Sequence, residues 1–113
     1  MIINVSDEDN AIIVYIKGAI NSHNINILED KIRELISHKK YNIILDCSDV
    51  QSIDSTGLEI LMQAAKNVRL FRGNLVILTT NEDIREIFKI TRIDKEIKVH
   101  TSQKQALQEF RQD

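Results

Sequence analysis

The spacing of apolar residues changes between two periods along the chain, and this change predicts alternating strands and helices. Short runs rich in β-branched residues are typical of strands. They lie at positions 2–5, 11–17, 41–45, 75–78 and 96–99. Elsewhere apolar residues recur every three or four positions, as on a helix with one buried face. Such helical stretches cover about 24–36, 57–71, 84–88 and 102–110.

The order of these elements predicts one α/β domain over residues 1–113, with a mostly parallel or mixed sheet of about five strands and four helices. The first two strands are expected to be antiparallel, because the polar segment 6–10 between them has the composition of a hairpin loop. Functional groups in such sheets lie just past the carboxyl ends of strands. The junction before the second helix is therefore of particular interest.

That junction is IDSTGL at positions 53–58, where Asp54, Ser55 and Thr56 precede Gly57. Side chains of all three types cap helices, since their oxygens accept hydrogen bonds from free amides of the first turn. Thr56 with Glu59 fits a capping box. Asp54 as the cap would instead leave the residues at 53 and 58 to pack together as a hydrophobic staple. The sequence does not decide between the two.

One cap uses only one of these side chains, so the junction also predicts a regulatory hydroxyl. Whichever residue caps the helix, Ser55 is expected near its start with an exposed hydroxyl. A phosphate there would meet the positive end of the helix dipole and free amides. It would also add about −1.5 to −2 charges next to Asp54. A partner that fits a neutral hydroxyl would be repelled.

Composition excludes several other functions. The formal net charge of −2 gives no reason to expect nucleic acid or an anionic membrane as a partner. No apolar run approaches the length of a membrane span, and the start lacks the pattern of a secretory signal. With Cys47 as the single cysteine, a cytosolic protein is expected.

Candidate chemistry is sparse. The three histidines lack ligand spacing, so no metal is expected, and no glycine-rich phosphate loop indicates a cofactor. The acid and the glycine of the junction are not spaced as in aspartic proteases. Cys47 is expected to pack rather than react, and Asp46 is expected to have a structural role. We therefore do not expect an enzyme.

The junction IDSTGL, following DCSDV at positions 46–50, resembles the D-S-[ST]-G-L hallmark of bacterial anti-sigma factor antagonists, which belong to the STAS domain family. Other segments carry the resemblance further. Gly18 and Asn24 match the G-x-[IL]-D-x-x-N entry to the first helix, GNLVI at 73–77 resembles the fourth strand, and TSQKQAL at 101–107 resembles the last helix. The resemblance covers nearly the whole chain and implies a STAS-like fold.

The resemblance implies a partner-switching function. In that family, the serine that corresponds to Ser55 is phosphorylated by a serine kinase that is also the anti-sigma factor. The unmodified antagonist binds this kinase and frees a sigma factor, so transcription is controlled. A serine phosphatase reverses the modification, and ATP binds to the kinase rather than to the antagonist. The alternative is a STAS module that does not switch and acts as a scaffold in a transport or signalling complex.

Carried over to this chain, the resemblance implies a partner surface around the phosphorylated serine. Ile60 and Met62 lie beside the buried stripe of the second helix, either as boundary core or as an apolar rim for a partner. The expected partner-binding residues are Asp54, Ser55, Thr56, Gly57, Leu58, Ile60, Met62, Asn21, Ser22 and His23.

The chain departs from the family pattern at two positions. Asn21 stands where aspartate is commoner, which removes a charge from the loop near Ser55 and affects contacts with a partner. Arg92 stands where many relatives have glycine, in TRI rather than T-G-L. The third helix is therefore expected to end differently.

Overall fold

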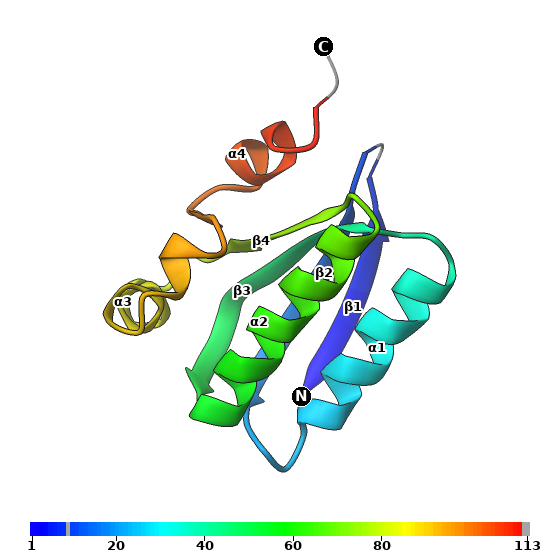
Figure 1. Cartoon of the computed structure of the whole chain (residues 1–113). Coiled ribbons are helices and arrows are strands. Elements are labelled where there is room, and N and C mark those ends of the chain that lie inside the picture. Colours follow the sequence, from blue (N-terminus) through cyan, green and yellow to red (C-terminus); the bar gives the residue numbers. More distant parts are fainter. Residues whose placement is uncertain (9, 112–113) are drawn as a thin grey trace.

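The computed structural model describes residues 1–8 and 10–111, and within them five strands form one sheet with helices on both faces (Figure 1). The strands are β1 (Ile2–Asp7), β2 (Ile12–Ile20), β3 (Asn42–Ile53), β4 (Asn74–Leu78) and β5 (Val99–His100). The helices are α1 (Ile25–Ser37), α2 (Ser55–Leu70), α3 (Glu82–Ile90), the short 3₁₀ helix η1 (Ile93–Lys95) and α4 (Gln103–Gln108).

The strands follow one another across the sheet in chain order, β1-β2-β3-β4-β5. Only β1 and β2 are antiparallel, while the remaining pairs are parallel and are joined through α1, α2 and α3. This arrangement confirms the predicted mixed α/β fold, including the antiparallel first pair. The parallel pairs place the carboxyl ends of β2 and β3 at the same edge of the sheet, where α1 and α2 begin (Figure 1).

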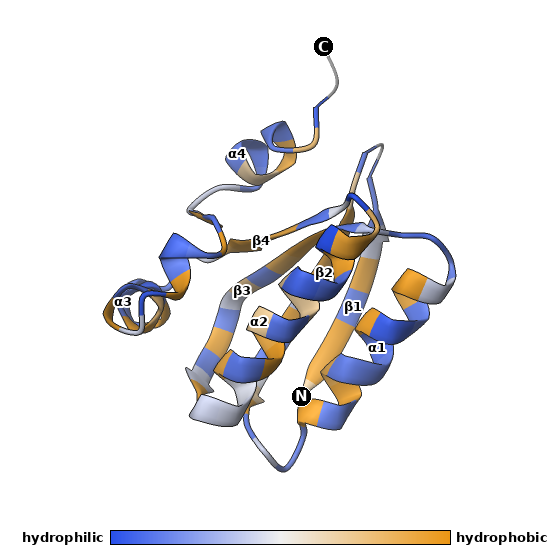
Figure 2. Cartoon of the chain, viewed as in Figure 1, coloured by the Kyte–Doolittle hydropathy of each residue, from blue (hydrophilic) through white to orange (hydrophobic). Residues whose placement is uncertain are grey.

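The sheet separates two apolar cores of unequal size. The larger core lies between the sheet and α1, α2 and α3, whose inner faces are apolar and outer faces polar (Figure 2). Alternate residues of β3 and β4 face the other side, where Ala106 of α4 and Phe110, two residues after this helix, cover them. Parallel strands covered on both faces account for the uninterrupted apolar runs at 43–45 and 75–78.

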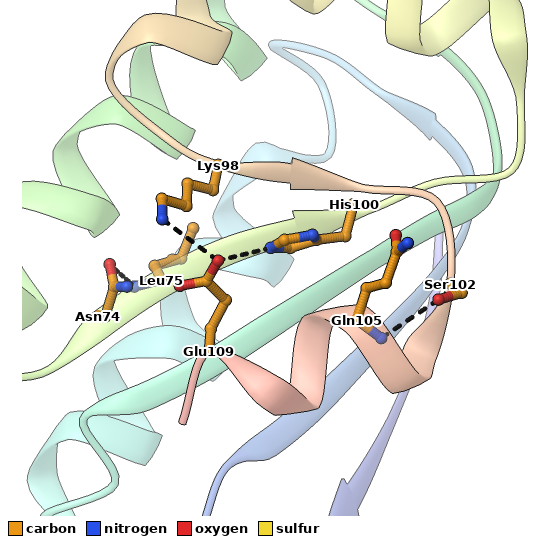
Figure 3. Close-up of polar contacts among 7 residues, drawn as sticks. All are labelled: Asn74, Leu75, Lys98, His100, Ser102, Gln105 and Glu109. Atoms are coloured by element: carbon orange, nitrogen blue, oxygen red, sulfur yellow. Dashed lines mark hydrogen bonds and ion pairs between the residues drawn. The ribbon is translucent and has the colours of Figure 1, made fainter. Parts of the chain in front are cut away.

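Polar contacts at both ends of α4 hold it against the sheet (Figure 3). Ser102 is its N-cap and accepts a hydrogen bond from the Gln105 amide at 3.2 Å. After the helix, the Glu109 carboxylate lies 3.0 Å from His100 Nε2 and 3.4 Å from Lys98 Nζ. Ser102 therefore caps the helix that the apolar spacing predicted at about 102–110.

Several strand boundaries were predicted wrongly. β2 does not end at Lys17 but continues to Ile20. β3 does not end at Leu45 but continues to Ile53, because Cys47 and Val50 are buried while the intervening residues are polar and face outward. The final strand is not 96–99 but Val99–His100, because Ile97 is buried at the end of the turn that begins with Ile93. Within the predicted hairpin loop 6–10, residues 6 and 7 belong to β1, and residue 9 lies outside the described residues.

A cationic residue with left-handed backbone geometry lies just after each of three helices. Lys39, Arg72 and Arg92 follow α1, α2 and α3, with φ angles of 62°, 63° and 63°. Glycine favours this conformation, which lets the next residues turn away from the helix. The positive side chains also complement the negative ends of the helix dipoles. Contrary to expectation, Arg92 therefore adopts the backbone conformation that a glycine there would favour.

The left-handed geometry of Arg92 predicts a measurable strain. We expect Arg92→Gly to be more stable than Arg92→Ala by about 1 kcal/mol, because both variants lose the charge but only alanine keeps a Cβ in the left-handed region. Urea unfolding of the two variants measures this difference. Equal stabilities would show that the conformation carries no strain at this position.

Candidate functional site

The carboxyl ends of β2 and β3 bring two distant segments together. Ile20 and Ile53 are register partners at the ends of these strands, and the Asp54 amide donates to the Ile20 carbonyl at 3.1 Å. Register shifts occur at Tyr15/Lys17 and at Gly18/Ala19. Bulges of this kind bend strands and redirect side chains, often near functional sites. As a result, the loop 21–24 lies beside the start of α2.

Asp54 is the N-cap of α2 and also connects the helix to this loop. One carboxylate oxygen accepts from the Gly57 amide at 2.9 Å, and the other accepts from the Ser22 amide at 3.1 Å. Of the two caps that the sequence left open, the structure therefore has Asp54 rather than Thr56. Ile53 and Leu58, the two residues of the expected hydrophobic staple, are both half-buried and pack against the larger core.

These hydrogen bonds stabilise the ionised form of Asp54. The bond from the Gly57 amide is the largest cause that lowers the pKa of the Asp54 carboxyl, and the amides of Ser22 and Thr56 act in the same direction. The nearby His23 lowers the pKa further. A fixed negative charge therefore stands at the start of α2, where the helix dipole favours it.

Ser55 is the first residue of α2 and is exposed, whereas Thr56 is half-buried. The helix begins two residues before the predicted start at 57, since Asp54 satisfies its first turn. Ser55 thus offers an accessible hydroxyl next to an ionised carboxylate. The amide of Gly57 is occupied by Asp54, so fewer free donors surround the hydroxyl than the sequence suggested.

The loop between β2 and α1 is built around two asparagines. The side-chain oxygen of Asn21 accepts from the amides of His23 at 2.9 Å and Asn24 at 3.2 Å. Asn24 in turn accepts from the Asn21 amide at 3.0 Å and donates to the Ala19 carbonyl at 2.8 Å. Asn21 therefore supplies the acceptor oxygen that an aspartate would supply, but without the negative charge.

Ser22 and His23 are exposed at the tip of this loop, beside Asp54. The structure thus brings together all three loop residues and the junction residues that the resemblance implied. Asn24 was matched to the family pattern but was not among the predicted site residues. Its two hydrogen bonds show that it shapes the loop rather than presents a surface.

Gly57 lets α2 approach the strand ends closely. A Cβ atom at this position would lie 2.8 Å from Ile20 Cγ2 and 2.9 Å from Ile53 Cγ1, both shorter than van der Waals contact. The glycine is buried, so these neighbours have little room to move. Its role is therefore to set the distance between the helix and the sheet, and with it the position of Ser55.

Two grooves flank the exposed side of α2. The α1–α2 groove, of about 250 Å³, contains the apolar side chains of Ile36, Ile60, Leu70 and Phe71. The α2–α3 groove, of about 680 Å³, runs past Ser55, Leu58 and Met62. Ile60 lines both grooves. Ile60 and Met62 are half-buried and contact the larger core, as boundary residues do. Their role as an apolar rim for a partner stays a prediction.

The α2–α3 groove also contains charged residues that the sequence analysis did not assign to the site. Lys66 and Arg92 line it, together with Glu59 and Glu96. Lys66 follows Leu58 and Met62 at steps of four, so helical periodicity could have assigned it to the same face. Arg92 comes from the loop after α3, and no local pattern connects it with α2.

Asp46 and Cys47 have structural roles, as predicted. The Asp46 carboxylate accepts from the Ser48 amide at 3.0 Å, within β3. Cys47 is fully buried in the larger core, and burial raises the pKa of its thiol to about 12.

In residues 1–8 and 10–111, no group of three or more potential ligand side chains is placed to hold a metal ion. No helix of the described chain is long and apolar enough to cross a membrane.

Sequence comparison places this architecture among known proteins. The STAS domain model matches residues 3–106. A protein of Thermotoga maritima named "Putative anti-sigma factor antagonist" is 26% identical over 104 residues, covering 91% of this chain and 92% of that protein. A protein of Bordetella bronchiseptica with the same description is 29% identical over 83 residues, covering 74% of this chain and 72% of its own length.

Solved structures show the same fold. An anti-sigma factor antagonist from Mycobacterium paratuberculosis superposes with a TM-score of 0.88 at 22% identity, covering 98% of this chain and 94% of that chain. The Bacillus cell fate determinant SpoIIAA in its phosphorylated form gives 0.73 at 14% identity, covering 97% and 100%. A murine anion transporter of the solute carrier 26 family gives 0.72 at 14%, covering 91% of this chain but 18% of the transporter.

The lowered pKa of Asp54 predicts how stability depends on pH. Asp54→Asn keeps an oxygen for the Gly57 amide but cannot ionise, so the wild type should be more stable at neutral pH. This advantage is fully present above the unfolded-state pKa of about 3.9 and is lost as pH falls through the lower folded-state pKa. Urea unfolding of both proteins across this range measures it. A difference independent of pH would contradict the assignment.

The close packing of Gly57 predicts a destabilised Gly57→Ala variant. Alanine has the higher helix propensity, but its Cβ would overlap Ile20 and Ile53, so the free energy of unfolding should fall by about 1–3 kcal/mol. Ser55→Ala, two residues earlier and exposed, is the control and should change stability by less than about 0.5 kcal/mol. Thermal and urea unfolding measure both. A stabilised Gly57→Ala would show that α2 can shift freely.

Proposed function

Because this chain belongs to the STAS domain family, we propose that it is an anti-sigma factor antagonist that is controlled by phosphorylation of Ser55. Without phosphate, it binds an anti-sigma factor that is also a serine kinase, and so releases a sigma factor for transcription. With phosphate on Ser55, it releases the anti-sigma factor. A serine phosphatase restores the binding form.

The exposed hydroxyl of Ser55 at the first position of α2 is the observation that carries this proposal. A kinase can reach it without unfolding the domain. The helix dipole stabilises the added charge, while the ionised Asp54 next to it repels the phosphate and directs it outward. The modification is therefore compatible with the fold and changes mainly the surface.

The partner surface proposed here consists of the start of α2, the loop 21–23 and the α2–α3 groove. Leu58, Ile60 and Met62 supply apolar contact area, and the exposed side chains of Ser22 and His23 supply polar contacts. A phosphate at the edge of this surface would have to be desolvated on docking. Burying an unpaired charge costs several kcal/mol, and about 1.4 kcal/mol changes affinity tenfold.

In this proposal the chain works by binding rather than by catalysis. ATP and its metal ion belong to the kinase, and the chemistry of dephosphorylation belongs to the phosphatase. All three proteins act in the cytosol. The relatives named as anti-sigma factor antagonists, which match 72% or more of their own length, support this choice.

The alternative is a STAS module that acts as a constitutive scaffold in a transport or signalling complex. The structural similarity to a segment of a solute carrier 26 transporter supports it. In this case Asp54 would only cap the helix, and Ser55 would not be modified. The two functions differ in whether a negative charge at Ser55 changes partner binding.

We expect the cognate kinase to transfer one phosphate from ATP to Ser55, because this hydroxyl is exposed at the helix start. Mass spectrometry of the product maps the site. Ser55→Ala should abolish the transfer, whereas Ser52→Ala, which removes an exposed hydroxyl near the end of β3 and outside the proposed partner surface, should leave it unchanged. Phosphate elsewhere, with Ser55→Ala still modified, would refute the assignment.

A charged substitution at the same position tests the switch itself. Ser55→Asp should weaken binding to the kinase by about tenfold or more, since the carboxylate must be desolvated at the interface. Calorimetry measures the affinity, and circular dichroism shows that the fold is kept. Equal affinities of the wild type and Ser55→Asp would favour the scaffold function.

A further inference from the structure

β1 is an edge strand with an open side. It pairs with β2, and no other strand of the described chain pairs with it. One row of its backbone amides and carbonyls therefore faces outward. Two of its apolar side chains are also exposed, Ile2 by 54% and Val5 by 43%. Such an edge is a template on which a further strand can pair.

This edge lacks the features that usually prevent strand pairing. Natural edge strands carry lysines, prolines or bulges, or are very short. β1 has six residues in regular register with β2, and it contains no lysine, arginine or proline. Its one charged residue, Asp7, lies 3.8 Å from Lys40, which offsets its charge. Nothing in the strand itself therefore opposes pairing.

We propose that β1 is an interface at which a second copy of this chain pairs antiparallel, so that the two sheets become one continuous sheet. A second copy is the partner that this surface fits best. Three of the six side chains of β1 are apolar and its single charge is offset by Lys40, so the edge is complementary to itself and gives a charged partner no particular advantage. The twofold axis of such a pair is perpendicular to the sheet and passes through the centre of β1.

The register follows from the side-chain pattern. A perpendicular twofold axis keeps the helices of both copies on the same face, so opposing residues must both face the helices or both face away. An axis at Asn4 places Ile3 opposite Val5 of the second copy, and Ile2 opposite its Ser6. An axis at Val5 would instead place Asp7 opposite Ile3. We therefore infer the register centred on Asn4, which extends the larger core across the interface.

The outer flank of α1 fits the same interface. Glu29 and Arg33 line the α1–α2 groove, so the 100° step of a helix turns Ile27 to the opposite flank. Ile27 is 51% exposed, and α1 lies on the β1 side of the sheet (Figure 1). The charged neighbours of Ile27 on the helix are paired: Lys31 and Glu34 form an ion pair of 3.3 Å, and Asp30 pairs with Arg33 at 3.2 Å. In the proposed pair this flank of α1 lies next to the same flank of the second copy, and neither flank carries an unpaired charge beside Ile27.

Cysteine cross-linking tests the interface and its register. Asn4→Cys places two thiols directly opposite each other, at the Cα separation that a disulfide needs. Ser6→Cys is the matched control, because the two Ser6 positions would lie roughly 14 Å apart along the strands. Cys47 is fully buried and does not compete. Under mild oxidation, Asn4→Cys should form a covalent dimer much faster than Ser6→Cys. Equal rates would overturn the register.

Sedimentation equilibrium of the wild type, from low micromolar to submillimolar concentration, tests the association. The average mass should rise towards that of two chains. Val5→Lys should raise the dissociation constant of the dimer by about tenfold or more, because it introduces like charges at the edge. Ile90→Lys changes a residue of α3 that is 71% exposed and should have no effect. A wild type that stays monomeric throughout this range would refute the proposal.

Discussion

The carboxylate of Asp54 binds two backbone amides that belong to different parts of the chain, and the candidate site depends on this double contact. It closes the first turn of α2 and at the same time holds the loop after β2. The contact is possible only because β2 and β3 end together, and because Gly57 lets the helix approach them closely. Ser55 thus follows a residue whose position is set by three elements, although it is itself free of the core.

The periodicity of apolar residues in the sequence was sufficient to predict the overall fold. Apolar stripes predicted the helices, and continuous apolar runs predicted the covered strands, because both patterns report burial on known faces. The length of β3 escaped prediction, since its second half alternates polar and apolar residues and bulges interrupt the alternation. Ile97 misled the prediction of the last strand because a buried turn residue looks like a strand residue in sequence.

For the site, residue types indicated the chemistry, but tertiary contacts decided the geometry. The choice between Asp54 and Thr56 as the cap depends on the amide of Ser22, which is 32 residues away in sequence. The contribution of Arg92 to the α2–α3 groove depends on how the loop after α3 returns past α2. Local sequence contains neither fact, whereas the asparagine loop at 21–24 was visible because its hydrogen bonds are local.

β3 is paired unequally along its length, and this has a consequence for local dynamics. Its first half has neighbours on both sides, but β4 reaches only as far as Asp46, so the half that leads to Ser55 is paired with β2 alone. Side chains bridge this half on its other side, since Thr79 and Asn81, which follow β4, donate hydrogen bonds to the carbonyls of Cys47 and Val50. Movement of the segment after β4 therefore reaches the strand that leads to Ser55 through side chains rather than through a backbone ladder.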